Sequence, residues 1–222
     1  MRRASPPGSP LRRSAQGARA GREHRRRGEG GVQGEGPTTY WMHLQARADA
    51  TLADVDGILR ETWLECCGHL SAFEVAGTRY ELEPDGEYGP PAPPMGAARL
   101  ADVLRPRVRL AYEYDLGSTT HLRLQVAGRG PAVMQGRRKV DLLARNDRPV
   151  FNCGACGRYA ERICSVGCEG DEAMACAGCA AAHRCGPEVM SRVVNSPRTG
   201  VCGFPTVWSP VEFRPAKSQR RG

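Results

Sequence analysis

Hydrophobic and polar residues alternate along residues 40–47, and the spacing becomes helical a few residues later. Tyr40, Met42 and Leu44 alternate with polar neighbours, which predicts a half-buried strand. Thr51 and Asp54 then form a capping box, the signature of a helix start. Apolar residues follow at helical spacing as far as Gly68: Leu52, Val55, Ile58, Leu59, Trp63 and Cys66. The pattern predicts a strand followed by an amphipathic helix of about four turns.

The rest of the N-terminal two thirds favours strands. Residues 72–82 predict two short strands around Ala76-Gly77, and five prolines between Pro84 and Pro94 predict a loop. A short helix is expected over residues 97–104, then a hairpin of residues 108–114 and 122–126 turning at Gly117, and a last strand over 140–144. This order predicts an α+β fold, a mostly antiparallel sheet with one or two helices packed on it.

Eight potential metal ligands then follow in four short-spaced pairs: Cys153/Cys156, Cys164/Cys168, Cys176/Cys179 and His183/Cys185. Four such pairs supply two tetrahedral Zn²⁺ sites with no ligand left over. The pairs can bind in sequence or interleaved. We favour interleaving, as in treble-clef and cross-brace modules, with the first and third pairs on one ion and the second and fourth on the other. Seven cysteines and one histidine indicate closed structural sites, because a catalytic zinc keeps an open position.

The same stretch has few large apolar side chains to bury. Apart from alanines, it offers little beyond Tyr159, Ile163, Val166 and Met174. A structural zinc ion supplies about 10–16 kcal/mol, whereas ordering each residue costs about 1–2 kcal/mol. We therefore expect this module to need metal in order to fold.

Charge is unevenly distributed over the 222 residues, whose net charge is +8. Residues 1–36 hold nine arginines against three glutamates, and residues 214–222 hold four basic residues and no acid, so the body between them is left at about −2. We divide the chain into a disordered Arg/Gly-rich arm (1–36), an α+β domain (38–149), a zinc module with a polar loop (150–205) and a basic tail (206–222).

The sequence favours a reducing, cytoplasmic location. Ten cysteines suggest disulfides in a secreted chain, but residues 1–36 lack the apolar segment of a signal peptide, and no stretch has transmembrane length. Metal ligation is therefore the better explanation of the cysteines. We expect no membrane partner.

Electrostatics favour a protein partner for the zinc module over DNA. Residues 151–186 carry three arginines against four acids, and two zinc ions with seven thiolates bring the module to about −4. DNA contact through the basic ends stays an alternative. A basic strip before the module is another possible DNA contact, although a charged strip is more often a solvated strand face. The strip consists of Arg137, Arg138, Lys139, Arg145 and Arg148.

Several other residues carry weaker chemical signals. Cys66 and Cys67 are best interpreted as small buried hydrophobes, and Cys202 lies in a polar loop that either binds a partner or packs on the zinc module. His69 and Asp115 could form a catalytic pair if they met in space, although single polar residues in loops are more often caps and turn formers. We identify no catalytic residues and no cofactor-binding residues besides the zinc ligands.

Five separated motifs resemble one family. They are YWMHL (40–44), WLECCGHLSAF (63–73), YEYDLGSTT (112–120), LLARN (142–146) and NSPRTGVCG (195–203). In this order they are similar to the Ri-plasmid ORF-three-like family, whose cysteine-rich members are described as TnpR-like passenger proteins of insertion-sequence elements. The resemblance implies an α+β domain followed by a zinc module, and a gene that travels with mobile elements.

Two functions are compatible with these observations. The first is a non-catalytic accessory or passenger protein of an insertion sequence, whose zinc-stabilised module binds a protein such as a transposase. The alternative is a DNA-binding recombination accessory factor or a resolvase-like or nuclease-like enzyme that uses His69, Asp115 and the basic strip. The glycine-rich phosphate loop and the nucleophile elbow are both missing from the sequence, so enzymatic activity is the less favoured expectation.

Overall fold

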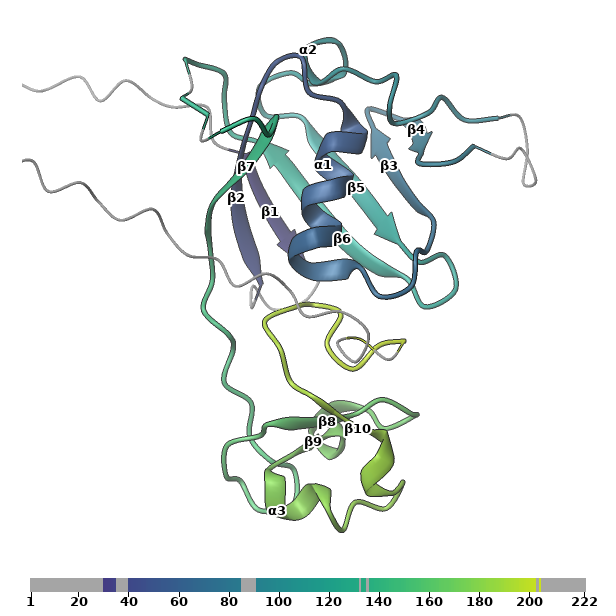
Figure 1. Cartoon of the computed structure of the whole chain (residues 1–222), viewed down its shortest axis with the longest axis vertical. Coiled ribbons are helices and arrows are strands. Elements are labelled where there is room, and N and C mark those ends of the chain that lie inside the picture. Colours follow the sequence, from purple (N-terminus) through teal and green to yellow (C-terminus); the bar gives the residue numbers. More distant parts are fainter. Residues whose placement is uncertain are drawn as a thin grey trace, which may run out of the picture.

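A large antiparallel sheet with a helix across one face lies beside a small cysteine-rich module, and an extended segment after β7 joins them (Figure 1). The computed structural model describes residues 30–34, 40–84, 91–131, 133–134, 136–202 and 204. The basic tail (206–222) and most of the N-terminal arm lie outside these residues. No helix in the described part of the chain is both long and apolar enough to span a bilayer.

The large sheet has seven strands in the order β4-β3-β5-β6-β1-β2-β7, and every neighbouring pair is antiparallel. The strands are β1 (Gly30–Gly34), β2 (Trp41–Ala46), β3 (Ser71–Val75), β4 (Thr78–Glu81), β5 (Arg109–Tyr114), β6 (Thr120–Val126) and β7 (Val140–Arg145). Together with the helix that covers one face, this confirms the predicted α+β class.

Strand β1 was not anticipated, because residues 1–36 were predicted to be a disordered arm. Gly30–Gly34 instead pairs with β6 on one side and β2 on the other. A glycine-rich stretch has no period-two pattern of apolar residues, so hydrophobic periodicity cannot detect it. Its place in the sheet rests on main-chain hydrogen bonds to two neighbours.

The predicted helix forms, and its start is capped as expected. Helix α1 (Leu52–Leu59) begins at Thr51, whose hydroxyl accepts from the Asp54 amide at 3.2 Å, while the Asp54 carboxylate accepts from the Thr51 amide at 2.8 Å. A π-helical turn η1 (Arg60–Leu64) continues it. The helical backbone ends at Leu64, short of the predicted Gly68, because Glu65 adopts an extended conformation.

The remaining strands form the predicted hairpins. Strands β3 and β4 turn at Ala76 and Gly77, which both have positive φ, as a two-residue type I′ turn requires. Helix α2 (Leu100–Val103) is shorter than the predicted 97–104. One face of the sheet and α1 enclose a core whose largest members are Trp63, Tyr112 and Tyr114, each fully buried.

The module is a three-stranded antiparallel sheet with short helical turns. Its elements are β8 (Arg162–Cys164), η2 (Gly170–Ala173), β9 (Met174–Ala175), α3 (Ala177–Ala180), η3 (Pro187–Val189) and β10 (Met190–Arg192), in strand order β10-β8-β9. Its buried cluster consists of three cysteines, three alanines and Met190. Such a core buries too little apolar surface to order the module by itself.

After β10 the chain runs back to the large sheet (Figure 1) and forms a segment that we call the return loop, residues 195–204. Ser196, Arg198 and Phe204 in this loop are completely buried. The Ser196 hydroxyl donates to the Trp63 carbonyl at 2.6 Å. On its other side, Gly200 leaves so little space that a Cβ there would lie 2.9 Å from Ile163 Cδ1 of β8. The loop thus packs against the module, which is one of the two alternatives that the sequence left open, and also inserts into the α+β domain.

Candidate metal centres

The module gathers its eight predicted ligands into two groups, and the grouping is the interleaved one. Centre A consists of Cys153, Cys156, Cys176 and Cys179, and centre B of Cys164, Cys168, His183 and Cys185. Within each group the ligand atoms all lie within 4.8 Å of one another. The first and third pairs thus share centre A, and the second and fourth pairs share centre B.

Local backbone conformation aims the cysteines inward in centre A. The amide of Gly157 donates to the Cys153 carbonyl at 2.8 Å, and the positive φ of Gly157 closes this turn after Cys156. Cys176 is the N-cap of α3, so Cys179 lies one turn later on the same side. Gly154 lies so close to η2 that a Cβ there would sit 2.2 Å from the Asp171 carbonyl oxygen. The two halves of the centre are therefore packed tightly together.

The separations between ligand atoms fit a zinc ion. Four sulfurs around a tetrahedral Zn²⁺ with bonds of about 2.3 Å lie about 3.8 Å apart. The Cys156 sulfur lies 3.7 Å from the sulfurs of both Cys176 and Cys179 in centre A. In centre B, the Cys168 sulfur lies 3.6 Å from the Cys185 sulfur and 3.9 Å from His183 Nε2. Both ligand sets suit a soft divalent ion such as Zn²⁺.

The thiols of centre A differ in pKa. A hydrogen bond from the Arg158 guanidinium is the main cause that lowers the pKa of Cys156 to about 6. Hydrogen bonding to Cys156 and Cys176 raises the pKa of Cys179 to about 12. Neighbouring thiolates repel, so without a cation some of the sulfurs keep their protons. A bound dication would reverse this preference and hold all four as thiolates.

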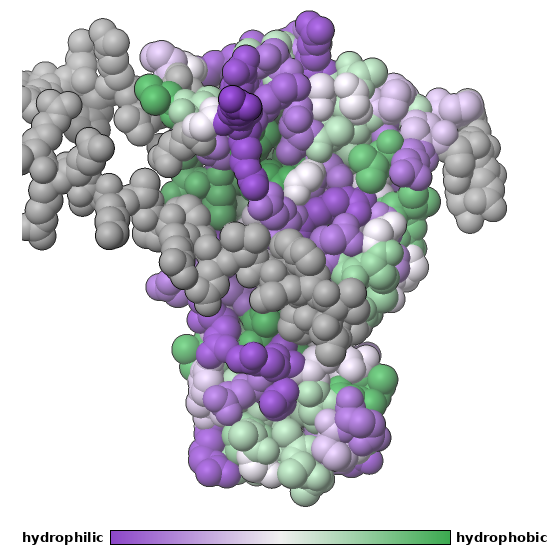
Figure 2. Space-filling model, viewed as in Figure 1, coloured by the Kyte–Doolittle hydropathy of each residue, from purple (hydrophilic) through white to green (hydrophobic). Residues whose placement is uncertain are grey.

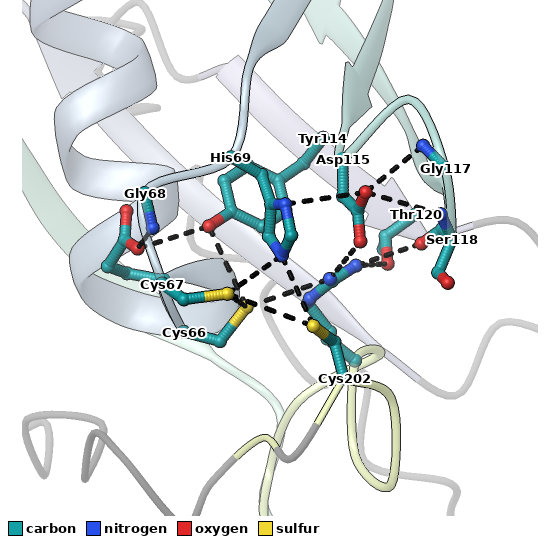
Figure 3. A network of polar contacts seen from close by, with 12 residues as sticks. Cys66, Cys67, Gly68, His69, Tyr114, Asp115, Gly117, Ser118, Thr120 and Cys202 are labelled. Carbon is teal, nitrogen blue, oxygen red and sulfur yellow. Dashed lines mark hydrogen bonds and ion pairs between the residues drawn. The ribbon is translucent and has the colours of Figure 1, made fainter. Parts of the chain in front are cut away.

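A third group lies outside the module, where the return loop meets the α+β domain. We call it the interface cluster: Cys66, Cys67, His69 and Cys202, whose ligand atoms also lie within 4.8 Å of one another (Figure 3). Cys66 is buried, as expected from sequence, but Cys67 is exposed, so its interpretation as a buried hydrophobe is wrong. Cys66-Cys67 and His69 follow η1, and Cys202 belongs to the return loop.

His69 and Asp115, proposed from sequence as a conditional pair, do meet. His69 Nδ1 lies 3.5 Å from Asp115 Oδ1, and the Nε2 atom on the opposite side of the ring points at the sulfurs of Cys67 and Cys202 (Figure 3). Burial opposes ionisation of Asp115, but hydrogen bonds from Arg198 and from the amides of Ser118 and Gly117 outweigh it and lower the pKa of this carboxyl. Asp115 therefore stays a carboxylate beside the imidazole.

Intramolecular contacts occupy much of the basic strip before the module. Arg138 pairs with Glu61 at 2.5 Å, and Lys139 pairs with Asp54 at 3.3 Å. The Arg148 guanidinium lies over the Tyr159 ring and also donates to the Val193 carbonyl at 3.3 Å. Arg145 likewise has partners within the chain. These contacts support the interpretation of the strip as a structural face.

Comparisons with known proteins give a partial structural similarity and no family. No protein-family model and no curated protein sequence matches the chain. A similar solved structure is that of a protein of unknown function, MM3350, from Methanosarcina mazei Go1, with 20% sequence identity and a TM-score of 0.42. The match covers 49% of this chain and 65% of that one, so this chain spans a little less than two thirds of its length.

Proposed function

We propose that centres A and B each bind one zinc ion, and that these two ions hold the module in its fold. The observation that carries this proposal is the closed, interleaved pair of ligand sets, four cysteines in one and three cysteines with one histidine in the other. Four protein ligands complete a tetrahedral zinc and leave no position for water or substrate. The centres are therefore structural, and the module acts through the surface that they stabilise.

We further propose that this surface binds another protein. The module exposes Glu169, Asp171 and Glu188, and of these three none has an ion pair among the described contacts. Together with the excess of thiolate over zinc charge, these acids repel phosphate and favour a basic protein surface. Figure 2 shows the module as a separate lobe below the large sheet, which leaves it accessible to a partner.

The resemblance found in the sequence supplies a candidate partner. A passenger or accessory protein of an insertion sequence would meet the transposase of the same element. We propose that the module binds such a transposase and that the chain itself catalyses no reaction. The sequence motifs and the acidic surface support this assignment.

A binding assay tests the assignment directly. The tagged chain should retain the transposase of its element, and the triple variant E169K/D171K/E188K should lose at least tenfold in affinity through charge reversal. Glu74→Lys, at the one exposed position of β3, is the control and should bind like the wild type. Equal binding by the triple variant, or no binding by the wild type, would contradict the proposal.

DNA binding is a second candidate, favoured by the contact between His69 and Asp115. A recombination factor using this pair would retain DNA at physiological salt without residues 1–29, because basic ends supply only salt-sensitive binding. Mobility shifts at two salt concentrations separate the two functions when the chain lacks residues 1–29, which hold all nine arginines of the arm but none of β1. Specific retention at the higher salt would favour the DNA-acting alternative.

A further inference from the structure

We infer that the interface cluster is a third zinc site, and that its ion fastens the return loop to the α+β domain. Cys66, Cys67 and His69 come from the segment after η1, whereas Cys202 comes from the return loop. A single ion would thus join parts of the chain that lie more than a hundred residues apart. This site is independent of centres A and B, and the protein would carry three zinc ions.

The donor geometry supports the assignment. The Cys67 sulfur lies 3.7 Å from the Cys66 sulfur and 3.8 Å from the Cys202 sulfur. These separations are the sulfur–sulfur edges of about 3.8 Å expected around a tetrahedral zinc. His69 Nε2 lies 3.0 Å from Cys67 and 3.2 Å from Cys202. The sulfur–nitrogen edge at zinc is about 3.6 Å, so the imidazole needs to retreat by about half an ångström to admit the ion.

The surroundings supply the outer contacts that metal ligands require. A histidine that binds zinc through one ring nitrogen commonly gives its other N–H to a carboxylate, which fixes the ring. Asp115 stands beside His69 Nδ1 in that position. Arg198 donates to the Cys66 sulfur at 3.6 Å, and the Tyr114 hydroxyl lies 3.9 Å from the same sulfur. Both are outer contacts to a ligand atom.

Charge around this site is largely compensated. One zinc ion and three thiolates sum to −1, and Asp115 adds a second negative charge nearby. The buried guanidinium of Arg198, 2.5 Å from the Asp115 carboxylate and within reach of Cys66, compensates one of them. Without a dication, only weak hydrogen bonds join the three thiols and the histidine.

A redox-active disulfide and a nucleophilic cysteine explain less of the cluster. A disulfide uses two of the three sulfurs and has no role for His69 or Asp115. A cysteine nucleophile needs one thiol and its base, and leaves two further cysteines without a purpose. Four donors complete the tetrahedral shell of one zinc ion, so we assign a closed structural site.

Metal content of the full chain tests the inference. Protein purified under reducing conditions should contain about three zinc ions per chain, and H69A about two, because a three-donor remnant holds zinc weakly. His121→Ala is the matched control, since His121 is an exposed histidine on β6 near Glu113, and it should keep all three. Equal zinc content in the wild type and H69A would overturn the inference.

Cobalt substitution identifies the ligands. Co²⁺ should occupy the interface cluster of wild-type protein with a tetrahedral visible spectrum and an intense thiolate charge-transfer band. With Co²⁺ in all three sites, ten thiolates contribute to that band, and C66A should lose about three tenths of it because the three-donor remnant of this site no longer holds the ion. An unchanged band in C66A would show that Cys66 is not a ligand and would overturn the closed site. Recovery of a Cys67–Cys202 disulfide from protein purified under reducing conditions would also overturn it.

Proteolysis tests the fastening role separately. Arg198 is fully buried, so trypsin should cleave after it slowly in the wild type and faster in H69A, while H121A stays protected. Equal cleavage rates in H69A and H121A would show that the ion does not hold the loop.

Discussion

The guanidinium of Arg198 lies 2.5 Å from the carboxylate of Asp115, and this buried ion pair spans 83 residues of sequence. Arg198 also donates to the Ser118 carbonyl at 3.0 Å and stacks over the Tyr114 ring at 4.9 Å. The return loop therefore inserts a charged side chain under the turn of the β5–β6 hairpin. We expect the return loop to stay docked on the α+β domain only when both Arg198 and Asp115 are present.

Arg198→Met should destabilise the chain by about 3–5 kcal/mol, because it leaves the Asp115 carboxylate buried without its cation. Equilibrium urea unfolding, followed by tryptophan fluorescence, measures the loss. Arg192→Met on β10 is the control, since Arg192 is exposed, and should change stability by less than about 0.5 kcal/mol.

The double variant R198M/D115N should recover part of that stability, because it removes the unpaired charge. Additive losses in the double variant would show that the two residues act independently.

Gly154→Ala should weaken the module by about 1–3 kcal/mol, because its Cβ would collide with the Asp171 carbonyl and force β9 and η2 away from centre A. Gly178→Ala in α3 is the control, since its Cβ would meet only Arg158 Nη2 at an ordinary 3.5 Å. Zinc affinity, measured by competition with a chromophoric chelator, should fall in G154A alone. Equal affinities in both variants would show that the close approach at Gly154 is not needed.

Zinc affinity of centre A should rise with pH. At pH 7 the Cys179 thiol, with its pKa raised to about 12, must release its proton to the solvent when zinc binds, whereas Cys156, with its pKa lowered to about 6, is already a thiolate. Affinity should fall about tenfold per pH unit for each proton displaced. The fall should steepen below pH 6, where Cys156 is also protonated.

Arg158→Gln should move that steepening to higher pH, because the hydrogen bond from Arg158 is the main cause of the low Cys156 pKa. Arg192→Gln should leave the profile unchanged. Chelator competition between pH 5.5 and 8 gives both profiles, and an affinity independent of pH would exclude thiolate ligation.

Thr51→Ala should destabilise the α+β domain by about 1 kcal/mol, because it removes the hydroxyl that accepts from the Asp54 amide at the start of α1. Thr78→Ala, an exposed substitution on β4, serves as the control. If T51A unfolds at the same urea concentration as T78A, the cap contributes nothing to stability.

Short sequence patterns correctly predicted the features that depend on residues close together in the chain. The capping box marked the start of α1, the Ala76-Gly77 turn placed β3 against β4, and short cysteine pairs marked the candidate ligands of the module. Each signal lies within a few residues, so the sequence contains it directly. Strand β1 escaped detection because its pairing uses the main chain and needs no pattern of side chains.

The interface cluster could not be predicted for a different reason. Cys202 lies 135 residues from Cys67, and no spacing rule joins two such positions. The short Cys66-Cys67-Gly68-His69 run was the available signal, since thiols and an imidazole two or three residues apart can chelate. The fourth donor arrives only when the return loop folds back, which is a property of tertiary structure.

The zinc-dependent fold of the module is tested most directly by amide hydrogen exchange of residues 151–192 before and after metal removal under reducing conditions. We predict strong protection in the zinc-loaded chain, with about two zinc ions assigned to centres A and B. We also predict near-complete loss of that protection when a chelator removes them, while β5 and β6 stay protected. A module that keeps its protection without metal would contradict the account.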